Sequence, residues 1–313
     1  MIKIILLTVV FFLNLNSQLF AKDFNPDGCS KSNAYVVFEE KNRNILLDRN
    51  SDIKIYPASL VKLMTLYLTF EAIEEKKISL NKLIPISGRA EEISLVNKVN
   101  TLHLKRGDTI TVREAILAVI VRSFNESAIA LAEAVANDEW LFVRLMNLKA
   151  LELGMNDTSF RNASGLHDLA QYTTARDLAR LAIAIKKDFP EYYHLFALKK
   201  FKFDGKKYKT HNHILEEYFG AEGLKTGFTH ASGFNLIASA YKNNSRIISV
   251  LIGCTSAAKR EAFTRLLLDE AYKKIPNRIY PEISGKINKG FDYNQNSLYL
   301  SRNRPEKVIR QGL

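Results

Sequence analysis

Hydrophobic and polar residues alternate near both ends of the chain, a pattern that is typical of half-buried β-strands. Residues 34–39 and 43–47 predict two strands joined by a tight turn. Residues 234–241 and 246–252 predict a second hairpin, because two asparagines stand between these apolar segments. Strands are therefore expected at opposite ends of the sequence.

Longer apolar segments occupy the middle of the chain and predict helices. The expected helices span residues 59–75, 109–121, 126–136, 139–153, 174–187 and 262–272. Thr111, with Glu114 three residues later, predicts a helix cap, and Gly154 predicts a helix end. This order favours an α/β (α+β) fold with a central antiparallel sheet built from both chain ends, flanked by helices and carrying an inserted all-helical subdomain. We expect a site in the cleft between sheet and helices.

The first 21 residues have the layout of a signal peptide. A positive start at Lys3 is followed by the apolar run 4–13 and then by polar residues up to Ala21. This run is too short to span a bilayer comfortably, and no other segment is apolar enough to do so. We expect cleavage after Ala21 and export to a periplasm-like space; the alternative is an uncleaved anchor.

Composition is that of an ordinary globular protein, with 47% hydrophobic and 25% charged residues. The formal net charge is +12, and the basic residues are spread along the chain without an Arg-rich arm or a nucleic-acid module. They indicate either a solvated basic surface or attraction to an anionic envelope polymer or to peptide carboxylates. The two cysteines, Cys29 and Cys254, have no zinc-binding spacing.

A serine and a lysine stand three positions apart at the start of an expected helix, as Ser59 and Lys62. This spacing places the hydroxyl beside the amine on one helical face. A lysine can deprotonate a serine only when burial or a nearby cation lowers the lysine pKa. The alternative is a helix cap with a solvated lysine, and the pair alone does not decide between them.

A second serine lies two positions before an asparagine, as Ser123 and Asn125, between two apolar helices. In an extended turn the two side chains point the same way. They offer a proton shuttle and an amide that can hold a peptide carbonyl. An N-cap for the following helix is an equally good local interpretation.

Lys225, Thr226 and Gly227 form a third motif just before the C-terminal hairpin. On an edge strand they would present a cation and a hydroxyl, and the glycine would leave room for a substrate backbone. The alternative is a surface lysine near a turn.

Together and in this order, the motifs match the set Ser-x-x-Lys, Ser-x-Asn and Lys-Thr-Gly of penicillin-interactive enzymes. Residues 30–275 resemble low-molecular-mass penicillin-binding proteins of the D-alanyl-D-alanine carboxypeptidase family. The segments that carry this resemblance are residues 56–60, 123–133, 153–155, 164–168 and 223–229. The resemblance implies the β-lactamase/D,D-peptidase-like fold, with a catalytic domain over residues 22–275 and a short polar tail over residues 276–313.

The resemblance also implies a serine carboxypeptidase that removes the terminal D-alanine of cell-wall peptides. Ser59 would form an acyl-enzyme with the carbonyl between the two D-alanines. Lys62 would be the base, with its pKa lowered by burial and by Lys225. Ser123 would pass a proton to the departing amine.

Substrate-binding roles are implied for Asn125, Lys225, Thr226, Gly227, Phe228 and Arg260. Asn125 would hold the substrate amide, and the backbone N–H groups of Ser59 and Phe228 would stabilise the oxyanion. The implied partners are peptidoglycan stem peptides ending in D-Ala-D-Ala, with β-lactams as inhibitors and no nucleic acid. No cofactor or metal is expected, since His211 and His213 lack a third ligand at a useful spacing.

The chain departs from the family in two places. The tail after Ile275 is too short for the β-rich second domain and anchor helix of many members, so membrane attachment through such a helix is not expected. Phe228 stands where some relatives have histidine.

Three alternatives stay open: a D,D-endopeptidase, a catalytically silent scaffolding protein, and a β-lactamase. A class A β-lactamase needs an additional glutamate to activate the deacylating water. No clear equivalent is found, since Glu152 and Glu191 lie in segments that look helical.

In the fold that the resemblance implies, the strands nearest to Cys29 and Cys254 are antiparallel neighbours. The two sulfurs could then come within bonding reach. An oxidising compartment would preserve such a disulfide. The alternative is two unpaired cysteines.

Overall fold

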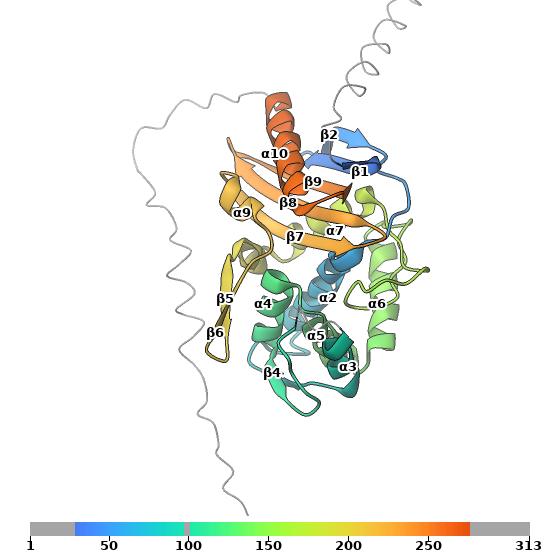
Figure 1. Ribbon diagram of the computed structural model, residues 1–313, viewed down its shortest axis with the longest axis vertical. Helices are drawn as coiled ribbons and strands as arrows, with labels where there is room; N and C mark the ends of the chain where they lie inside the picture. The colour runs from blue at the N-terminus through green and yellow to red at the C-terminus, as the bar shows by residue number, and fades with distance from the viewer. Residues whose placement is uncertain (1–28, 97–100, 276–313) are drawn as a thin grey trace, which may run out of the picture. The chain divides into compact units, whose positions relative to one another are not determined.

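The computed structural model describes residues 29–96 and 101–275 (Figure 1), and the predicted signal peptide and C-terminal tail lie outside these residues. A five-stranded antiparallel sheet forms the centre of the fold. Its strands are, in spatial order, β2 (Asn44–Arg49), β1 (Cys29–Glu39), β9 (Ser245–Cys254), β8 (Gly233–Lys242) and β7 (Ala221–Thr229). Strands from the two ends of the chain meet where β1 pairs with β9, which confirms the predicted fold class.

Helices cover both faces of the sheet and make up most of the chain between β2 and β7 (Figure 1). The longer ones are α2 (Lys62–Glu74), α3 (Gly88–Val96), α4 (Val112–Arg122), α5 (Asn125–Ala136), α6 (Glu139–Glu152), α7 (Ala175–Asp188) and α10 (Ala257–Lys274). The short ones are η1 (Ala58–Val61), α8 (Pro190–Tyr193), η2 (His194–Ala197) and α9 (Ile214–Glu217). The helical insertion also contains two hairpins that the sequence analysis does not predict, β3 (Leu83–Pro85) with β4 (Thr109–Thr111) and β5 (Lys200–Phe203) with β6 (Lys206–Lys209).

Alternation along β1 separates the hydrophobic core into two layers. Val36 and Phe38 belong to the cluster that includes the buried faces of α2 and α7. Tyr35 and Val37 belong to the cluster beneath α10, where the ring of Phe263 meets the ring of Tyr35 edge-on at 5.6 Å. Because each such side chain contributes about 1.5–3 kcal/mol when buried, the sheet is held firmly between the two layers.

Two helices begin later than predicted. Residues 109–111 form β4, and α4 begins at Val112, with Thr111 as the N-cap and Glu114 completing the predicted capping box. Residues 58–61 form a 3-10 turn before α2 begins at Lys62. Strand pairing and the tight turn after Pro57 do not appear in the hydrophobic pattern, which explains both corrections. No helix in the described part of the chain is long and apolar enough to cross a membrane.

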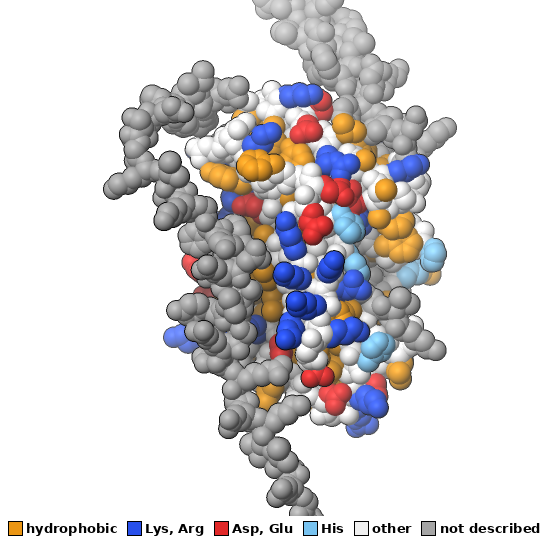
Figure 2. Space-filling view, turned by 60° about the vertical axis from the view of Figure 1, so that its left-hand side comes forward, with side chains coloured by type: hydrophobic (Ala, Val, Ile, Leu, Met, Phe, Trp, Pro, Cys, Tyr) orange, Lys and Arg blue, Asp and Glu red, His pale blue; other side chains and the backbone are white. Residues whose placement is uncertain are grey.

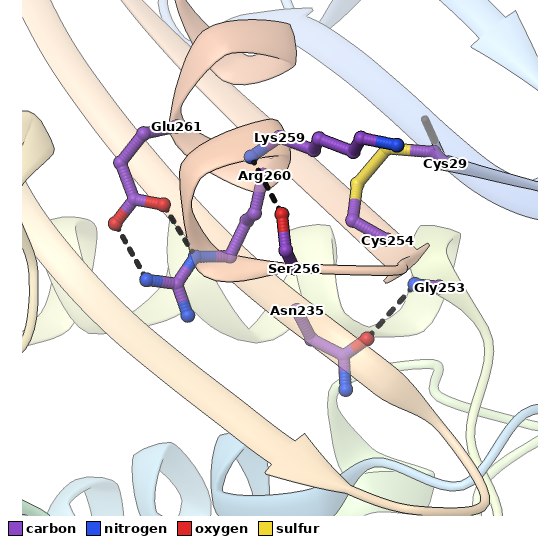
Figure 3. Close-up of a disulfide and its surroundings, with 8 residues drawn as sticks. All are labelled: Cys29, Asn235, Gly253, Cys254, Ser256, Lys259, Arg260 and Glu261. Carbon is purple, nitrogen blue, oxygen red and sulfur yellow. Dashed lines mark hydrogen bonds and ion pairs between the residues drawn. A yellow bond between two sulfur atoms is a disulfide. The ribbon is translucent and has the colours of Figure 1, made fainter. Parts of the chain in front are cut away.

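Cys29 and Cys254 form a disulfide between β1 and β9 (Figure 3), which decides between the two alternatives left open from the sequence. The two residues are partners in the strand register. The bond closes a loop with a sequence separation of 225, for which the chain-entropy relation gives about 5.5 kcal/mol of stabilisation as an upper value. Close by, the side-chain oxygen of Asn235 accepts from the amide of Gly253 at 2.9 Å and fixes the irregular end of the β8–β9 pair.

Candidate active site

Ser59 and Lys62 lie where η1 leads into α2. Side chains three positions apart eclipse one another in a 3-10 turn, and the amine of Lys62 lies 3.0 Å from the hydroxyl oxygen of Ser59. Leu60 and Val61, between them, are fully buried and fix the turn to the core. The predicted pair is therefore brought together, on a 3-10 turn rather than on a regular helix.

Lys62 is fully buried, and its amine has three oxygen neighbours. Besides the Ser59 hydroxyl, these are Oδ1 of Asn125 at 2.7 Å and the backbone carbonyl of Ser164. The last two oxygens carry no hydrogen and can only accept. A neutral amine has two hydrogens and one lone pair. With both hydrogens directed to Asn125 and Ser164, the lone pair faces the hydroxyl of Ser59.

The surroundings favour this neutral form. Burial, and then the positive charge of Lys225, lower the pKa of Lys62 well below its ordinary value, while Glu126 acts in the opposite direction. Glu126 is itself buried, and burial raises its pKa. Its Oε1 accepts from the hydroxyl of Thr101 and the backbone amide of Leu102. A buried, neutral amine beside a hydroxyl has the arrangement of a general base and its nucleophile.

Ser123 and Asn125 lie at the junction of α4 and α5. Ser123 ends α4 in the left-handed backbone region, with a φ of 62°, and Phe124 is the N-cap of α5. The alternative of a Ser123 N-cap is therefore wrong. The hydroxyl of Ser123 is buried and has no hydrogen-bond partner among the described residues. It remains available to exchange a proton with a bound molecule.

Lys225, Thr226 and Gly227 lie on β7, the edge strand of the sheet, as predicted. A Cβ at Gly227 would come within 3.3 Å of the backbone nitrogen of Ser59 and of the Ala58 side chain. The glycine thus makes room for the turn that carries Ser59, which corrects the expectation that it leaves this space for a substrate backbone. Lys225 is buried, and burial, followed by the charge of Arg260, lowers its pKa to about 7.

A loop to which the sequence analysis assigns no role completes the surroundings of Lys62. The carbonyl of Ser164 accepts from Lys62, and the hydroxyl of Thr65 donates to the preceding carbonyl of Ala163 at 2.7 Å. Gly165 has a φ of +81°, and a Cβ there would lie 2.0 Å from the carbonyl oxygen of Ala58. Residues 164–168 are part of the family resemblance, but a backbone carbonyl leaves no signal in residue type.

His167 lies at the edge of the site. Its ring meets the ring of Tyr56 edge-on at 4.8 Å. Both residues line a small hollow beside the Ser59 turn, which Thr229 at the end of β7 also lines. The hollow is therefore lined by the loop that follows Ser164, by the residues just before Ser59 and by the end of the edge strand β7.

Phe228 and Arg260 complete the residues singled out from the sequence. Phe228 follows Gly227 on β7, and its half-exposed ring packs against Phe234 at a centroid distance of 4.3 Å. Arg260 is buried in the first turn of α10, where its Nε donates to the carboxylate of Glu261 at 3.0 Å (Figure 3). Arg260 acts electrostatically on Lys225, so the two cations belong to one positive region.

His211 lies among cations. Burial, then the charges of Arg122 and Lys225, lower its pKa to about 4, so the imidazole is neutral at pH 7. In the described part of the chain, no group of three or more His, Cys, Asp or Glu could hold a metal ion. His211 and His213 therefore have no third ligand there.

Comparison with known proteins identifies the family of this chain. The family described as D-alanyl-D-alanine carboxypeptidase matches residues 22–256. The chain belongs to this family. Two relatives from Escherichia coli K12, the carboxypeptidases DacD and DacC, are each 34% identical to it, over 85% and 70% of this chain. The chain spans 70% of the length of the first relative and 56% of the second.

Solved structures of this family and of penicillin-binding proteins share the fold. Penicillin binding protein 5 from Haemophilus influenzae is 32% identical, with a TM-score of 0.75 over 80% of this chain and 72% of that one. Penicillin-binding protein D2 from Listeria monocytogenes, in its ampicillin-bound form, is 29% identical, with a TM-score of 0.69 over 79% of this chain and all of that one. The resemblance to the carboxypeptidase family stated from the motifs is thereby confirmed.

Proposed function

We propose that this protein is a serine D-Ala-D-Ala carboxypeptidase of the bacterial cell wall, with Ser59 as the nucleophile and Lys62 as its base. One observation carries this proposal. The buried amine of Lys62 has two neighbours that can only accept hydrogen bonds, and the hydroxyl of Ser59 is the third. The substrate is the stem peptide of peptidoglycan that ends in D-Ala-D-Ala. The family is named for the cleavage of this terminal bond.

In the acylation step, the hydroxyl oxygen of Ser59 attacks the carbonyl carbon between the two D-alanines, and its proton moves to the amine of Lys62. The backbone N–H groups of Ser59 and Phe228 stabilise the oxyanion. When the C–N bond breaks, Ser123 relays this proton from Lys62 to the departing amine of D-alanine. Lys62 is neutral again, and the ester on Ser59 is then hydrolysed by water.

The substrate is held at both sides of the scissile bond. Oδ1 of Asn125 is occupied by Lys62, so its amide N–H groups are directed to a substrate carbonyl. Lys225, Thr226 and Arg260 form the positive end that receives the terminal carboxylate. Gly227 keeps the edge strand close to the nucleophile.

β-Lactams acylate Ser59 in place of the peptide, and the ester is lost slowly. Rapid loss in class A β-lactamases requires a glutamate that activates water. Glu126 is fully buried, and its Oε1 is bound to Thr101 and Leu102 rather than to the nucleophile. Glu152 and Glu191 are exposed on the surface. A carboxypeptidase inhibited by penicillin is therefore favoured over a β-lactamase.

Export to the periplasm fits the same function. A structural disulfide is retained in an oxidising compartment, and the Cys29–Cys254 bond is of this kind. The signal-like N-terminus predicted from the sequence supports the same location.

The decisive experiment measures release of D-alanine from a short N-acylated peptide ending in D-Ala-D-Ala. The purified protein should release it, and Ser59→Ala should not. Ser79→Ala, at an exposed serine, is the matched control and should keep full activity. If the protein instead cut only cross-linked peptide dimers, the endopeptidase alternative would replace this proposal.

A further inference from the structure

The β5–β6 hairpin carries a concentration of positive charge that the proposed mechanism does not use. Residues 199–209 contain six lysines and one aspartate, a net charge of +5 in a chain whose formal charge is +12. Figure 2 shows Lys and Arg side chains gathered in the middle of the face on which this hairpin lies. Although basic residues occur along the whole sequence, the fold therefore concentrates them in space.

Strand pairing puts four of these lysines on one face of the hairpin. Lys200 is opposite Lys209, and Lys202 is opposite Lys207. All four are exposed. Directly opposite residues of an antiparallel pair point to the same face, and successive pairs on that face are about 7 Å apart along the strands. We call these four residues the lysine array.

The other face of the hairpin ties the lysine array to the active site. The rings of Phe201 and Tyr208 stack on each other at 5.1 Å, and both meet the ring of Phe124. Phe124 separates Ser123 from Asn125. Arg122, just before Ser123, donates to the backbone carbonyl of Lys209 at 3.4 Å. The array therefore has a fixed position beside the segment that carries Ser123 and Asn125.

The lysine array has no evident role in stabilising the fold. None of the ion pairs between described residues includes any of its four members. Like charges directly opposite each other destabilise a strand pair. A surface that opposes folding and has no internal partner points to an anionic partner outside the protein.

We propose that the lysine array binds the free carboxylates of neighbouring stem peptides on a peptidoglycan strand while Ser59 acts on one of them. The identity of the polymer rests on the proposed function. Repeated carboxylates on a polymer complement a fixed two-by-two array of cations. A lipid surface fits less well, because the rings of Phe201 and Tyr208 pack against Phe124 and are not presented for insertion.

The test compares two variants with the same change of charge. The array variant is K200Q/K202Q/K207Q/K209Q, and the control is K76Q/K82Q/K105Q/K259Q, at four exposed lysines elsewhere. Co-sedimentation with purified peptidoglycan at low ionic strength should show binding by the array variant weakened at least about tenfold. The control should bind nearly as the wild type does. Amidation of the peptidoglycan carboxylates should bring the wild type down to the level of the array variant.

Two further measurements keep the outcomes separate. The melting temperature of the array variant should not fall, because the substitutions remove like-charge repulsion. The rate of acylation by penicillin should be unchanged in both variants; failure of the wild type to be acylated would overturn the proposed function and leave the binding result intact. Equal binding by the two variants, or a loss seen only with phosphatidylglycerol vesicles, would overturn the role of the lysine array.

Discussion

The amine of Lys62 lies 2.7 Å from the side-chain oxygen of Asn125, a residue 63 positions away in the sequence. This contact joins the first residue of α2 to the first residue of α5. Because the amide oxygen can only accept, it directs one N–H of the amine away from Ser59. The lone pair of a neutral Lys62 is thereby aimed at the nucleophile, and this orientation depends on two helices packing together.

Lys62→Met should abolish most of the chemistry and leave the fold in place. Methionine has a similar volume, but the change leaves the oxygens of Asn125 and Ser164 without a donor, which costs about 1–3 kcal/mol. The rate of penicillin acylation, followed by intact-mass spectrometry, should fall at least about a thousandfold. Lys76→Met, at an exposed lysine, is the control. A near wild-type rate in Lys62→Met would mean that another group is the base.

Lys225 should make stability depend on pH. Burial and Arg260 lower its pKa from 10.5 to about 7 in the folded protein, so between these values the unfolded chain binds more protons. The contribution of this group to the free energy of unfolding is therefore full above pH 10.5 and is lost as the pH falls towards about 7.

Lys225→Met removes this dependence. As the pH is lowered from 10.5 to about 7, the free energy of unfolding of the wild type should fall relative to that of the variant. The fall should be up to about 1.4 kcal/mol for each pH unit. Urea unfolding of both proteins at about pH 7, 8.5 and 10 measures the effect. A difference that stays constant with pH would contradict the lowered pKa of Lys225. D-alanine release should also fall in the variant, because the cation for the substrate carboxylate is missing.

Local patterns were sufficient to predict the strands from the two chain ends and most long helices. The β5–β6 hairpin has such a pattern too, since lysine and phenylalanine alternate before Asp204-Gly205, a hairpin-turn dipeptide. These charged strands lack the apolar run that marks the other strands, so a search for apolar segments does not predict them. The short pair β3–β4 has three residues in each strand, too few for a period to show.

In the site, too, features within one local segment could be predicted and contacts between distant backbone segments could not. Ser59 and Lys62 were predictable as a pair because they share one turn. The carbonyl of Ser164 was not, because any residue supplies a backbone oxygen and its approach to Lys62 depends on a fold contact across 102 positions. The close packing of Gly227 against the Ser59 turn likewise arises only when β7 closes on η1. Residue types could be predicted, whereas these two backbone contacts between segments could not.

Arg260→Ala should weaken turnover of peptides with a free terminal carboxylate and spare amidated analogues. A guanidinium beside Lys225 favours the carboxylate specifically. We expect kcat/KM for the free acid to fall about tenfold or more, from one lost charged contact. Arg265→Ala, on the same helix, is the control. Because Glu261 loses its buried partner, the melting temperature is measured as well; equal loss on both substrates would indicate a structural role.

Removal of the disulfide should destabilise the protein without preventing its chemistry. The double variant Cys29→Ala/Cys254→Ala should lose up to about 5.5 kcal/mol in the free energy of unfolding. Reductant should lower the stability of the wild type towards that of the variant and leave the variant unchanged. Labelling of both cysteines in denatured, unreduced wild-type protein would contradict the bond.

Gly165 and Gly205 offer a matched pair of substitutions. Both have a positive φ, +81° and +77°, so alanine is strained at either position. A Cβ at Gly205 meets nothing within 4 Å, whereas a Cβ at Gly165 would lie 2.0 Å from the carbonyl oxygen of Ala58. Gly205→Ala therefore measures backbone strain alone, on the order of 1–2 kcal/mol.

Gly165→Ala should add a displacement of the Ser59 turn to that strain. The new methyl group can be accommodated only if Ala58 moves away, and Ser59 moves with it because its Cα lies 3.0 Å from the same position. A shift of about 1 Å at a nucleophile commonly lowers the rate about a hundredfold. Penicillin acylation should therefore fall by that factor in Gly165→Ala and stay near the wild-type rate in Gly205→Ala. If both variants lost stability equally and both kept full acylation, the loop at Ser164 would have no part in positioning Ser59.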